Sequence, residues 1–276
     1  MGRTHIAAMA SVRGIELIAS VDRDFEAVLK NPDIDAVDLC VPTDLHASFA
    51  IEALRSGKHV LVEKPMALDG AACDRMIAEA RVANRVLMVA HVLRFAPAYQ
   101  GLQQKLQNGG PVRAASFRRR SPQPGWADWL LDPCRSGGGV FDFMIHDVDM
   151  ALHLFGPPLA IAATGSESSC FDVIHAQLFY EEFAVEVAGG WHHRDSLPFS
   201  MEYTVVTEDA TLTYNSLTEA AAYNAYAAEI DYFACCCRNG GAPELCPPEE
   251  SAHAVRLTRA LADARKRNGE KLPWPN

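Results

Sequence analysis

Three short apolar runs, separated by segments of helical periodicity, limit the fold of this chain more than any other feature. The runs are DAVDLCV at 35–41, HVLVE at 59–63 and VLMVAH at 86–91. Between them, the segments near 44–56 and 69–84 carry apolar residues at helical spacing, and Asp69 is suited to cap the second. This alternation predicts a Rossmann-like, doubly wound parallel sheet, with IELIASVD at 15–22 as an additional strand.

After Arg94 the pattern changes from alternating strands and helices to a series of strands. We expect helices near 97–108 and 140–155, and strands at 112–121, 159–165, 173–181, 183–192 and 201–215, the last with a turn at Glu208–Asp209. Helices near 219–239 and 249–268 close the chain. The predicted fold class is therefore α/β followed by α+β. A Rossmann-like domain at 1–93 precedes a domain at 94–276 with a large open, mostly antiparallel sheet and helices on one face.

Composition excludes several classes of partner. The 276 residues are 49% hydrophobic and 22% charged, and the formal net charge of -10 argues against nucleic acid or an anionic membrane. Small molecules are the expected partners. The eight cysteines include three in a row, Cys235 to Cys237, and no paired C-x-x-C motifs, which indicates reduced thiols and a cytoplasmic protein. No apolar stretch approaches the eighteen residues of a membrane span, and MGRTHIAAM lacks the apolar core of a secretion signal.

Polar residues interrupt the apolar run GGGVFDFMIHDVDMALHLFG at 137–156. Steps of four and three residues return to the same side of a helix, so Asp142, His146, Asp149 and His153 share one face. Charged groups on a packing face are costly unless they are paired or face a cavity. The stripe therefore predicts a polar pocket wall, although a surface stripe or a metal site using carboxylates and imidazole would give the same pattern.

The predicted parallel strands end in a second set of polar residues. Ligands of doubly wound sheets bind beyond the carboxyl ends of the strands. The residues at those ends are Asp22, Pro42, Thr43, Glu63, Lys64, Pro65 and His91. An acid that closes the second strand, about 20 residues after the glycine-rich turn, binds the adenosine ribose in dinucleotide enzymes, and Asp22 follows Gly2 at that spacing. A simple turn-forming role for Asp22 explains the same residue.

Several blocks of the sequence resemble the Gfo/Idh/MocA oxidoreductases, the family of glucose-fructose oxidoreductase and inositol dehydrogenase. They are MGRTHIAAM, VDRD, VPTDLHASFAIEALRSGKHVLVEKPMAL, HVLRFAPAY and DPCRSGGGVFDFMIHDVDMALHLFGPP. Two departures stand out. The family's first strand and most of its phosphate loop precede the residue that matches Gly2, and only twelve residues separate Asp22 from Asp35. We therefore expect an incomplete dinucleotide-binding domain that binds NAD weakly or not at all.

The resemblance implies hydride transfer between a nicotinamide and a secondary alcohol of a sugar, cyclitol or related polyol. It assigns catalysis to Lys64, Asp142 and His146, with His146 as the acid/base. The cofactor residues implied are Gly2, Arg3, Asp22, Pro42, Thr43, His46, Glu63, Lys64 and Pro65. Those implied for the substrate are His91, Arg94, Trp126, Trp129 and Asp149. NAD is favoured over NADP because Asp22 would repel a 2'-phosphate, and a homodimer or homotetramer would form through the C-terminal sheet.

Alternative interpretations of the same residues stay open. Lys64 could be a solvated loop lysine, Arg94 a buried structural arginine, and Trp126 and Trp129 core residues. A family member without turnover could act as a binding or regulatory protein. A metal-dependent lyase or hydrolase using the face of Asp142, His146 and Asp149 is a third possibility, although we assign no metal to the site.

Overall fold

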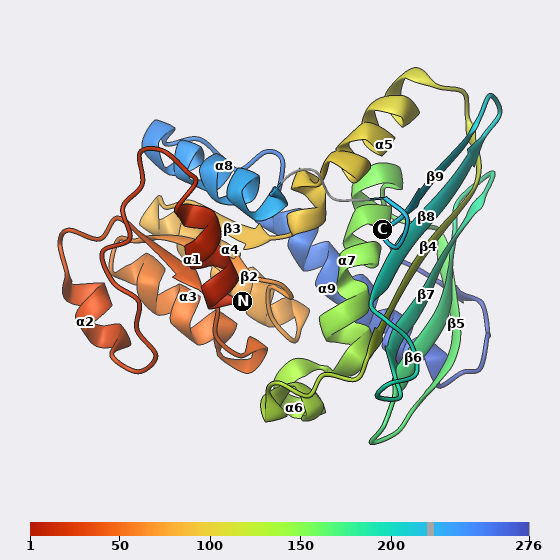
Figure 1. Ribbon diagram of the computed structural model, residues 1–276, viewed down its shortest axis with the longest axis horizontal. Coiled ribbons are helices and arrows are strands. Elements are labelled where there is room, and N and C mark those ends of the chain that lie inside the picture. Colours follow the sequence, from red (N-terminus) through yellow and green to blue (C-terminus); the bar gives the residue numbers. More distant parts are fainter. Residues whose placement is uncertain (220–223, 276) are drawn as a thin grey trace. The chain divides into compact units, whose positions relative to one another are not determined.

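The computed structural model describes residues 1–219 and 224–275, which divide into two compact units (Figure 1). Unit 1 contains residues 1–96 together with residues 224–253, and unit 2 contains residues 97–219 together with residues 254–275. The boundary expected after residue 93 falls three residues earlier than the one observed. Residues 224–253, which the sequence analysis assigns to the second domain, pack in unit 1. The physical reason is a helix whose apolar face covers the parallel sheet.

Unit 1 is built on a small sheet of three parallel strands. The strands β1 (Ala36–Leu39), β2 (His59–Glu63) and β3 (Leu87–Ala90) lie in the order β1-β2-β3. The helices are α1 (Gly2–Met9), α2 (Phe25–Lys30), α3 (His46–Arg55), α4 (Gly70–Ala83), α8 (Ala225–Asn239) and the first part of α9 (Pro248–Arg265). The Asp69 carboxylate accepts a hydrogen bond of 2.8 Å from the Ala72 amide, which confirms it as the N-cap of α4.

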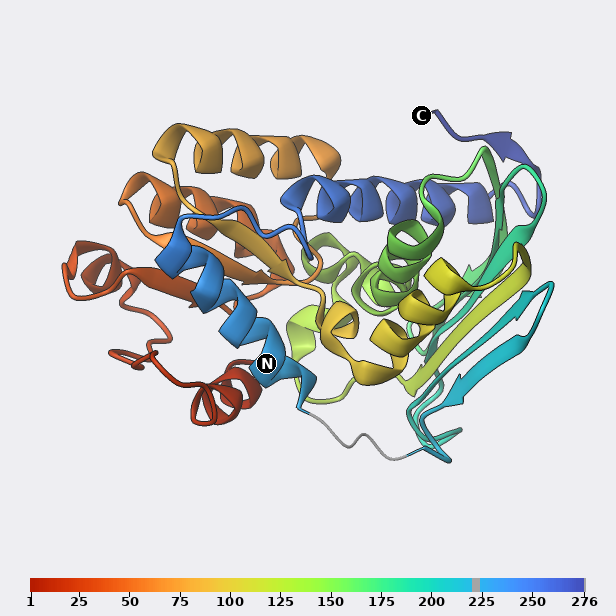
Figure 2. The same ribbon diagram turned by 90° about the horizontal axis from the view of Figure 1, so that it is seen from above.

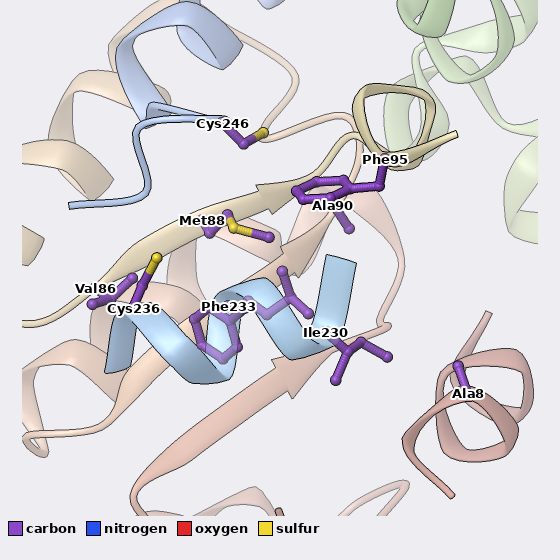
Figure 3. Packing of buried hydrophobic residues seen from close by; sticks show 10 residues of the cluster. Ala8, Val86, Met88, Ala90, Phe95, Ile230, Phe233, Cys236 and Cys246 are labelled. Carbon is purple, nitrogen blue, oxygen red and sulfur yellow. The ribbon is translucent and has the colours of Figure 1, made fainter. Parts of the chain in front are cut away.

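Alternation along the strands gives the sheet of unit 1 two different faces. Leu61 of β2 is in register with Met88 of β3, so both side chains point to the same face. That face packs against Ile230 and Phe233 of α8, as Figure 3 shows. Helices α3 and α4 lie on the opposite side (Figure 2). Burial of this α8 face explains why residues 224–253 belong to unit 1.

The strand expected at Ile15–Asp22 does not form, and that prediction is wrong. These residues adopt no regular structure, and the side chains of Leu17 and Ile18 are 48% and 45% exposed. A strand is stabilised by pairing with a neighbour. Within residues 1–219 and 224–275, β1 pairs only with β2, and Ile15–Asp22 pairs neither with the other edge of β1 nor with any other strand.

Unit 2 is a seven-stranded sheet with its helices on one face, as predicted. The order is β10-β5-β6-β7-β4-β8-β9, with every neighbouring pair antiparallel except β4 and β7. The strands are β4 (Val112–Pro122), β5 (Ala160–Glu167), β6 (Asp172–Phe179), β7 (Ala184–His192), β8 (Ser200–Thr207), β9 (Thr211–Asn215) and β10 (Leu272–Pro273). Helices α5 (Pro97–Asn108) and α7 (Gly138–Phe155) lie on the same face, and α6 (Pro133–Ser136) directly precedes α7 (Figure 1).

Most of the elements predicted after Arg94 agree with the structure, and the differences lie mainly at their ends. The run at 201–215 is a hairpin, β8 and β9, that turns at Glu208–Asp209 as expected. Strand β10 was not predicted, because two residues carry no periodicity. The helix expected from residue 219 begins at Ala225, and residues 220–223 of that prediction lie outside the described residues. Every described helix is too short or too polar to span a bilayer.

Candidate active site

The three parallel strands of unit 1 bring their carboxyl ends to one edge of the sheet. Because Leu39 is in register with Val62, and Glu63 with Ala90, the segments that follow the strands start side by side. These segments carry six of the residues expected to bind cofactor or substrate: Pro42, Thr43, Glu63, Lys64, Pro65 and His91. We refer to this edge as the strand-end edge. It is where ligands of doubly wound sheets bind.

Hydrogen bonds from buried side chains hold the Glu63–Lys64–Pro65 loop at this edge. Glu63 is 6% exposed, and its Oε2 accepts from the Lys64 amide at 3.0 Å. The bond between Lys64 and Pro65 is a cis peptide. His46 lies between two carbonyls, with Nδ1 2.8 Å from Pro65 O and Nε2 2.9 Å from Val41 O. The loop after β2 is thereby tied to the start of α3.

His46 lies at the centre of this arrangement. Burial lowers its pKa, whereas the Pro65 and Val41 carbonyls at its two ring nitrogens act in the opposite direction. The side chain is 1% exposed, which makes it a positioning group for the loop. Thr43 and His91 are also buried, whereas Pro42 and Lys64 keep part of their surface exposed. Lys64 is thus the ionisable side chain that the loop itself presents.

Helix α1 begins beside the end of β1. A Cβ on Gly2 would lie 3.7 Å from Cβ of Cys40, so the first turn of the helix passes close to the strand-end edge. The side chain of Arg3 is exposed. Asp22 is exposed in the irregular segment before α2, so the premise that it closes a strand is not met. The prediction that Asp22 contacts the ribose rested on that strand, so the structure gives it no support.

The N-terminus of α7 in unit 2 is fixed by contacts to β6 and β7. Gly137 and Gly138 both have φ of +81°, a conformation that favours glycine. The Val140 amide donates to Oδ2 of Asp172 at 3.2 Å, and Oδ1 of Asp172 accepts from Nη1 of Arg265 at 2.5 Å. Asp172 therefore caps the helix that carries the predicted polar stripe.

The stripe on α7 is divided by burial. Asp142 and His146 are half-buried, whereas Asp149 is 1% exposed. His153 is half-buried, and its Nε2 lies 3.0 Å from Nε2 of Gln103 on α5. Asp142, His146 and His153 thus combine proton-transfer chemistry with partial access; Asp142 and His146 lie one turn apart, whereas His153 contacts Gln103.

A buried ion pair that the sequence analysis did not identify secures the opposite side of α7. Arg119 of β4 donates from Nε and Nη2 to the two carboxylate oxygens of Asp147, at 2.7 and 3.1 Å. Burial raises the pKa of Asp147, and the guanidinium beside it acts in the opposite direction. A usable signal was present: alternation along Arg118–Arg119–Arg120 turns the middle residue toward the helices. Asp147 lies outside the stripe, one residue after His146.

The remaining predicted substrate residues are distributed over both units. Trp126 is 77% exposed, and Trp129 is half-buried in a 3-10 turn. Arg94 in unit 1 is 5% exposed, and its Nη1 donates to Glu250 at 2.6 Å and to the Leu245 carbonyl at 3.2 Å. These bonds are those of a buried structural arginine, which is the alternative stated for Arg94. The exposed face of Trp126 is available to a ligand.

The family models match both units. The model described as "Oxidoreductase family, NAD-binding Rossmann fold" matches residues 3–91, and the GFO/IDH/MocA C-terminal domain matches residues 99–213. The chain belongs to the Gfo/Idh/MocA family. The first match contains β1, β2 and β3, and therefore the strand-end edge of unit 1. The second match contains α7 and most of the large sheet, from β4 to β8.

Curated relatives of this Gfo/Idh/MocA chain include two inositol dehydrogenases. Myo-inositol 2-dehydrogenase of Thermotoga maritima is 34% identical over 137 residues, which are 49% of this chain and 40% of the relative. Inositol 2-dehydrogenase of Rhizobium meliloti is 33% identical over 165 residues, 58% of this chain and 47% of the relative. The matching part of the chain thus spans less than half of either relative. A levoglucosan dehydrogenase solved in complex with NADH shares the fold, with a TM-score of 0.81 at 18% identity, covering 92% of this chain and 83% of that one.

The described residues of this family member fit the nicotinamide side of a dinucleotide site better than the pyrophosphate side. The strand-end edge supplies a fixed loop with Lys64, next to the turn that carries Pro42 and Thr43. For the pyrophosphate, the first turn of α1 supplies Gly2 and the free amides of a helix N-terminus. A glycine turn of the form G-x-G-x-x-G would supply three glycines there. The nicotinamide side of the site is therefore the more complete.

Proposed function

We propose that this chain functions as an NAD(P)-dependent dehydrogenase acting on a secondary alcohol of a sugar, cyclitol or related polyol. The observation that carries the proposal is the fixed loop at the strand-end edge, where Glu63 and His46 hold the backbone around Lys64. The half-buried pair of Asp142 and His146 on α7 supports it from unit 2. The names of the relatives agree with this class of substrate.

In this proposal Lys64, His146 and Asp142 act on the substrate hydroxyl. Oxidation of an alcohol removes a hydride from carbon and a proton from oxygen, and NAD supplies the hydride acceptor when bound. His146 takes the hydroxyl proton, because an imidazole titrates near neutral pH. The ammonium of Lys64 donates a hydrogen bond to the same oxygen and stabilises negative charge that develops there. Asp142, one turn before His146, binds a neighbouring substrate hydroxyl.

We assign further contacts by the same proposal. Gly2 and Arg3 would approach the phosphates, while Pro42, Thr43, His46, Glu63 and Pro65 would shape the nicotinamide side. On the substrate side, Trp126 and Trp129 would stack on the apolar face of a sugar ring, and His91, Arg94 and Asp149 would line the site. NAD remains the proposed cofactor because the matching family model is that of an NAD-binding Rossmann fold; Asp22, exposed in an irregular segment, no longer supports that choice.

We also propose a homodimer or homotetramer that forms through the open face of the seven-stranded sheet. Strand β4 turns Ser116 and Arg118 to that face, away from α7. Arg118 lies 3.1 Å from Glu202 and 3.8 Å from Glu186, and His175 lies 3.2 Å from Glu186. Such a face suits a partly polar interface. Sedimentation velocity tests this: Ser116→Arg should dissociate the oligomer, and a wild-type monomer would contradict it.

Polyol-dependent reduction of NAD tests the activity itself. Purified protein would be incubated with millimolar NAD and a panel containing myo-inositol, scyllo-inositol, glucose and levoglucosan, and NADH formation followed by absorbance. We expect at least one panel member to support turnover, and NADP to support it less well. If the folded protein binds NADH and yet oxidises no panel member, the proposed substrate class is wrong.

A further inference from the structure

The α8 face of the sheet in unit 1 is apolar except near the strand-end edge. Along β1 the residues that point to this face include Asp38, and Cys40 continues the same alternation two residues later. Glu63 of β2 follows Leu61 on the same face. Helix α1 places His5 over these three side chains, and His5 is 1% exposed. A thiol, an imidazole and two carboxyl groups thus share a largely buried space.

Three side chains of this cluster bring donor atoms within 4.8 Å of one another, close enough to become ligands of one metal ion. His5 Nδ1 lies 2.8 Å from Oδ2 of Asp38 and 3.7 Å from Sγ of Cys40. Sγ of Cys40 lies 3.6 Å from Oδ1 of Asp38. Around a tetrahedral zinc ion, with bonds of about 2.0–2.3 Å, ligand atoms are separated by roughly 3.3–3.6 Å. Small rotations of the three side chains would therefore allow all of them to bind one ion.

The second nitrogen of His5 has a carboxylate beside it, as do the histidines of many metal sites in proteins. Its Nε2 lies 3.0 Å from Oε1 of Glu63, on the side of the ring opposite Nδ1. A carboxylate at the far nitrogen fixes the tautomer and orientation of a metal-bound histidine. Glu63 is itself held through Oε2 by the Lys64 amide. Glu63 would thus support His5, the predicted metal ligand, from the side of the ring that faces away from the ion.

An independent observation indicates that the cluster holds more acidic groups than His5 alone can balance. Glu229 of α8 is 0% exposed, and neither carboxyl oxygen has a hydrogen-bond partner among the described residues. Its carboxyl group interacts electrostatically with Glu63, His5 and Asp38, so it faces the same cluster. Burial of an unpaired acid is costly unless a cation or a proton neutralises it. A divalent ion would supply that charge.

We propose that His5 Nδ1, Asp38 and Cys40 Sγ bind one zinc ion, with Glu63 orienting His5 and Glu229 balancing charge. A set of nitrogen, sulfur and oxygen donors suits zinc better than magnesium or calcium, which take oxygen ligands. The ion fastens α1 to the edge strand β1. This proposal concerns a metal site in unit 1 and is independent of the dehydrogenase activity.

Metal binding to the nucleotide-free full chain tests the proposal. After chelation, zinc would be titrated by calorimetry, and cobalt followed by absorbance, because a cobalt–thiolate bond gives a charge-transfer band in the near ultraviolet. We expect one ion per chain with a dissociation constant below about one micromolar. Cys40→Ser should remove the band and weaken zinc binding more than about 100-fold, and Glu63→Gln should weaken it about 10- to 100-fold. Cys235→Ser, at an exposed thiol of α8, is the matched control.

A second readout uses the wild-type chain alone, so misfolding of a variant cannot explain its result. Zinc should protect Cys40 from alkylation by iodoacetamide, as mapped by mass spectrometry, and leave the exposed Cys235 reactive. Zinc should also raise the melting temperature. The proposal is overturned if no stoichiometric zinc binds, if the cobalt complex lacks the thiolate band, or if Cys40→Ser binds as tightly as wild type. Loss of binding in Cys235→Ser would equally overturn it.

Discussion

The two units collect their polar groups in different ways. In unit 1 the predicted ligand-binding residues come from three separate loops and meet because parallel strands end at one edge. In unit 2 the predicted acid/base residues lie on one helix, α7, at successive turns. The first arrangement depends on which strands are neighbours, whereas the second depends only on helical periodicity.

This difference determines how each region should respond to amino-acid substitutions. The strand-end edge is held by local hydrogen bonds between loops, such as those of His46 to Val41 and Pro65. Helix α7 is held from outside, through Asp172 at its N-terminus and Arg119 along its length. Changes in unit 1 should therefore alter ligand binding locally, and changes around α7 should affect the stability of unit 2 as well as turnover.

The largest expected effect is on turnover, from the acid/base residue of unit 2. His146→Ala should lower kcat by roughly two to four orders of magnitude on a confirmed substrate, because general acid/base catalysis contributes about that much. NADH affinity should change little, since the binding loops belong to unit 1. His253→Ala, at an exposed histidine of α9, is the matched control. Near-normal kcat in His146→Ala would remove this residue from the mechanism.

The next effect is on stability and tests how α7 is held. Arg119→Leu should lower the free energy of unfolding by about 3–5 kcal/mol, because it leaves Asp147 buried without its cation. Burial already raises the pKa of Asp147, so the carboxyl would take up a proton in this variant. Arg113→Leu, which removes an exposed ion pair to Glu208, should cost less than about 1 kcal/mol.

The Arg119 prediction is measured by denaturant unfolding. Arg119→Leu combined with Asp147→Leu should recover part of the lost stability, because no buried charge is then left unpaired. Equal stabilities for Arg119→Leu and Arg113→Leu would show that the buried pair does not secure α7.

A smaller effect is expected from the loop of unit 1. Lys64→Ala should lower kcat/KM by about 100-fold, the scale for loss of one group that stabilises charge at a reacting oxygen. The unfolding free energy should stay within about 0.5 kcal/mol of wild type, because the side chain is partly exposed. Lys30→Ala, at an exposed lysine of α2, is the control. A Lys64→Ala variant with unchanged kcat/KM would separate the loop from the chemistry.

The sequence predicted those parts of the molecule that depend on local patterns. Periodicity was sufficient for α3, α4, α5 and α7, and the side chain of Asp69 was sufficient for the start of α4. The segment Ile15–Asp22 also has a strand-like pattern, yet a strand needs a neighbour, and the sequence does not show which edges are available. Its failure removed the structural basis for placing Asp22 at a ribose.

Contacts between distant residues account for the parts of the site that were missed. Arg119 and Asp147 are 28 positions apart, and His5 and Asp38 are 33 apart, so no local period links either pair. The role of His46 follows from two carbonyls, Val41 and Pro65, that become neighbours only when β1 and β2 pair. The convergence of Lys64 with Asp142 and His146 stays a prediction.

Binding of NADH to this 276-residue chain tests the central claim most directly, namely that the strand-end edge holds a nicotinamide cofactor. A titration followed by nicotinamide fluorescence should show saturable binding with a dissociation constant well above micromolar, because Gly2 supplies only part of a phosphate cradle. Two or three missing charge-assisted hydrogen bonds, at about 1.5–3 kcal/mol each, account for that weakness. Lys64→Ala should weaken the binding further. Binding at micromolar affinity or tighter would contradict the predicted weakness, and no saturable binding up to millimolar NADH, or equal affinity in wild type and Lys64→Ala, would contradict the role of the strand-end edge.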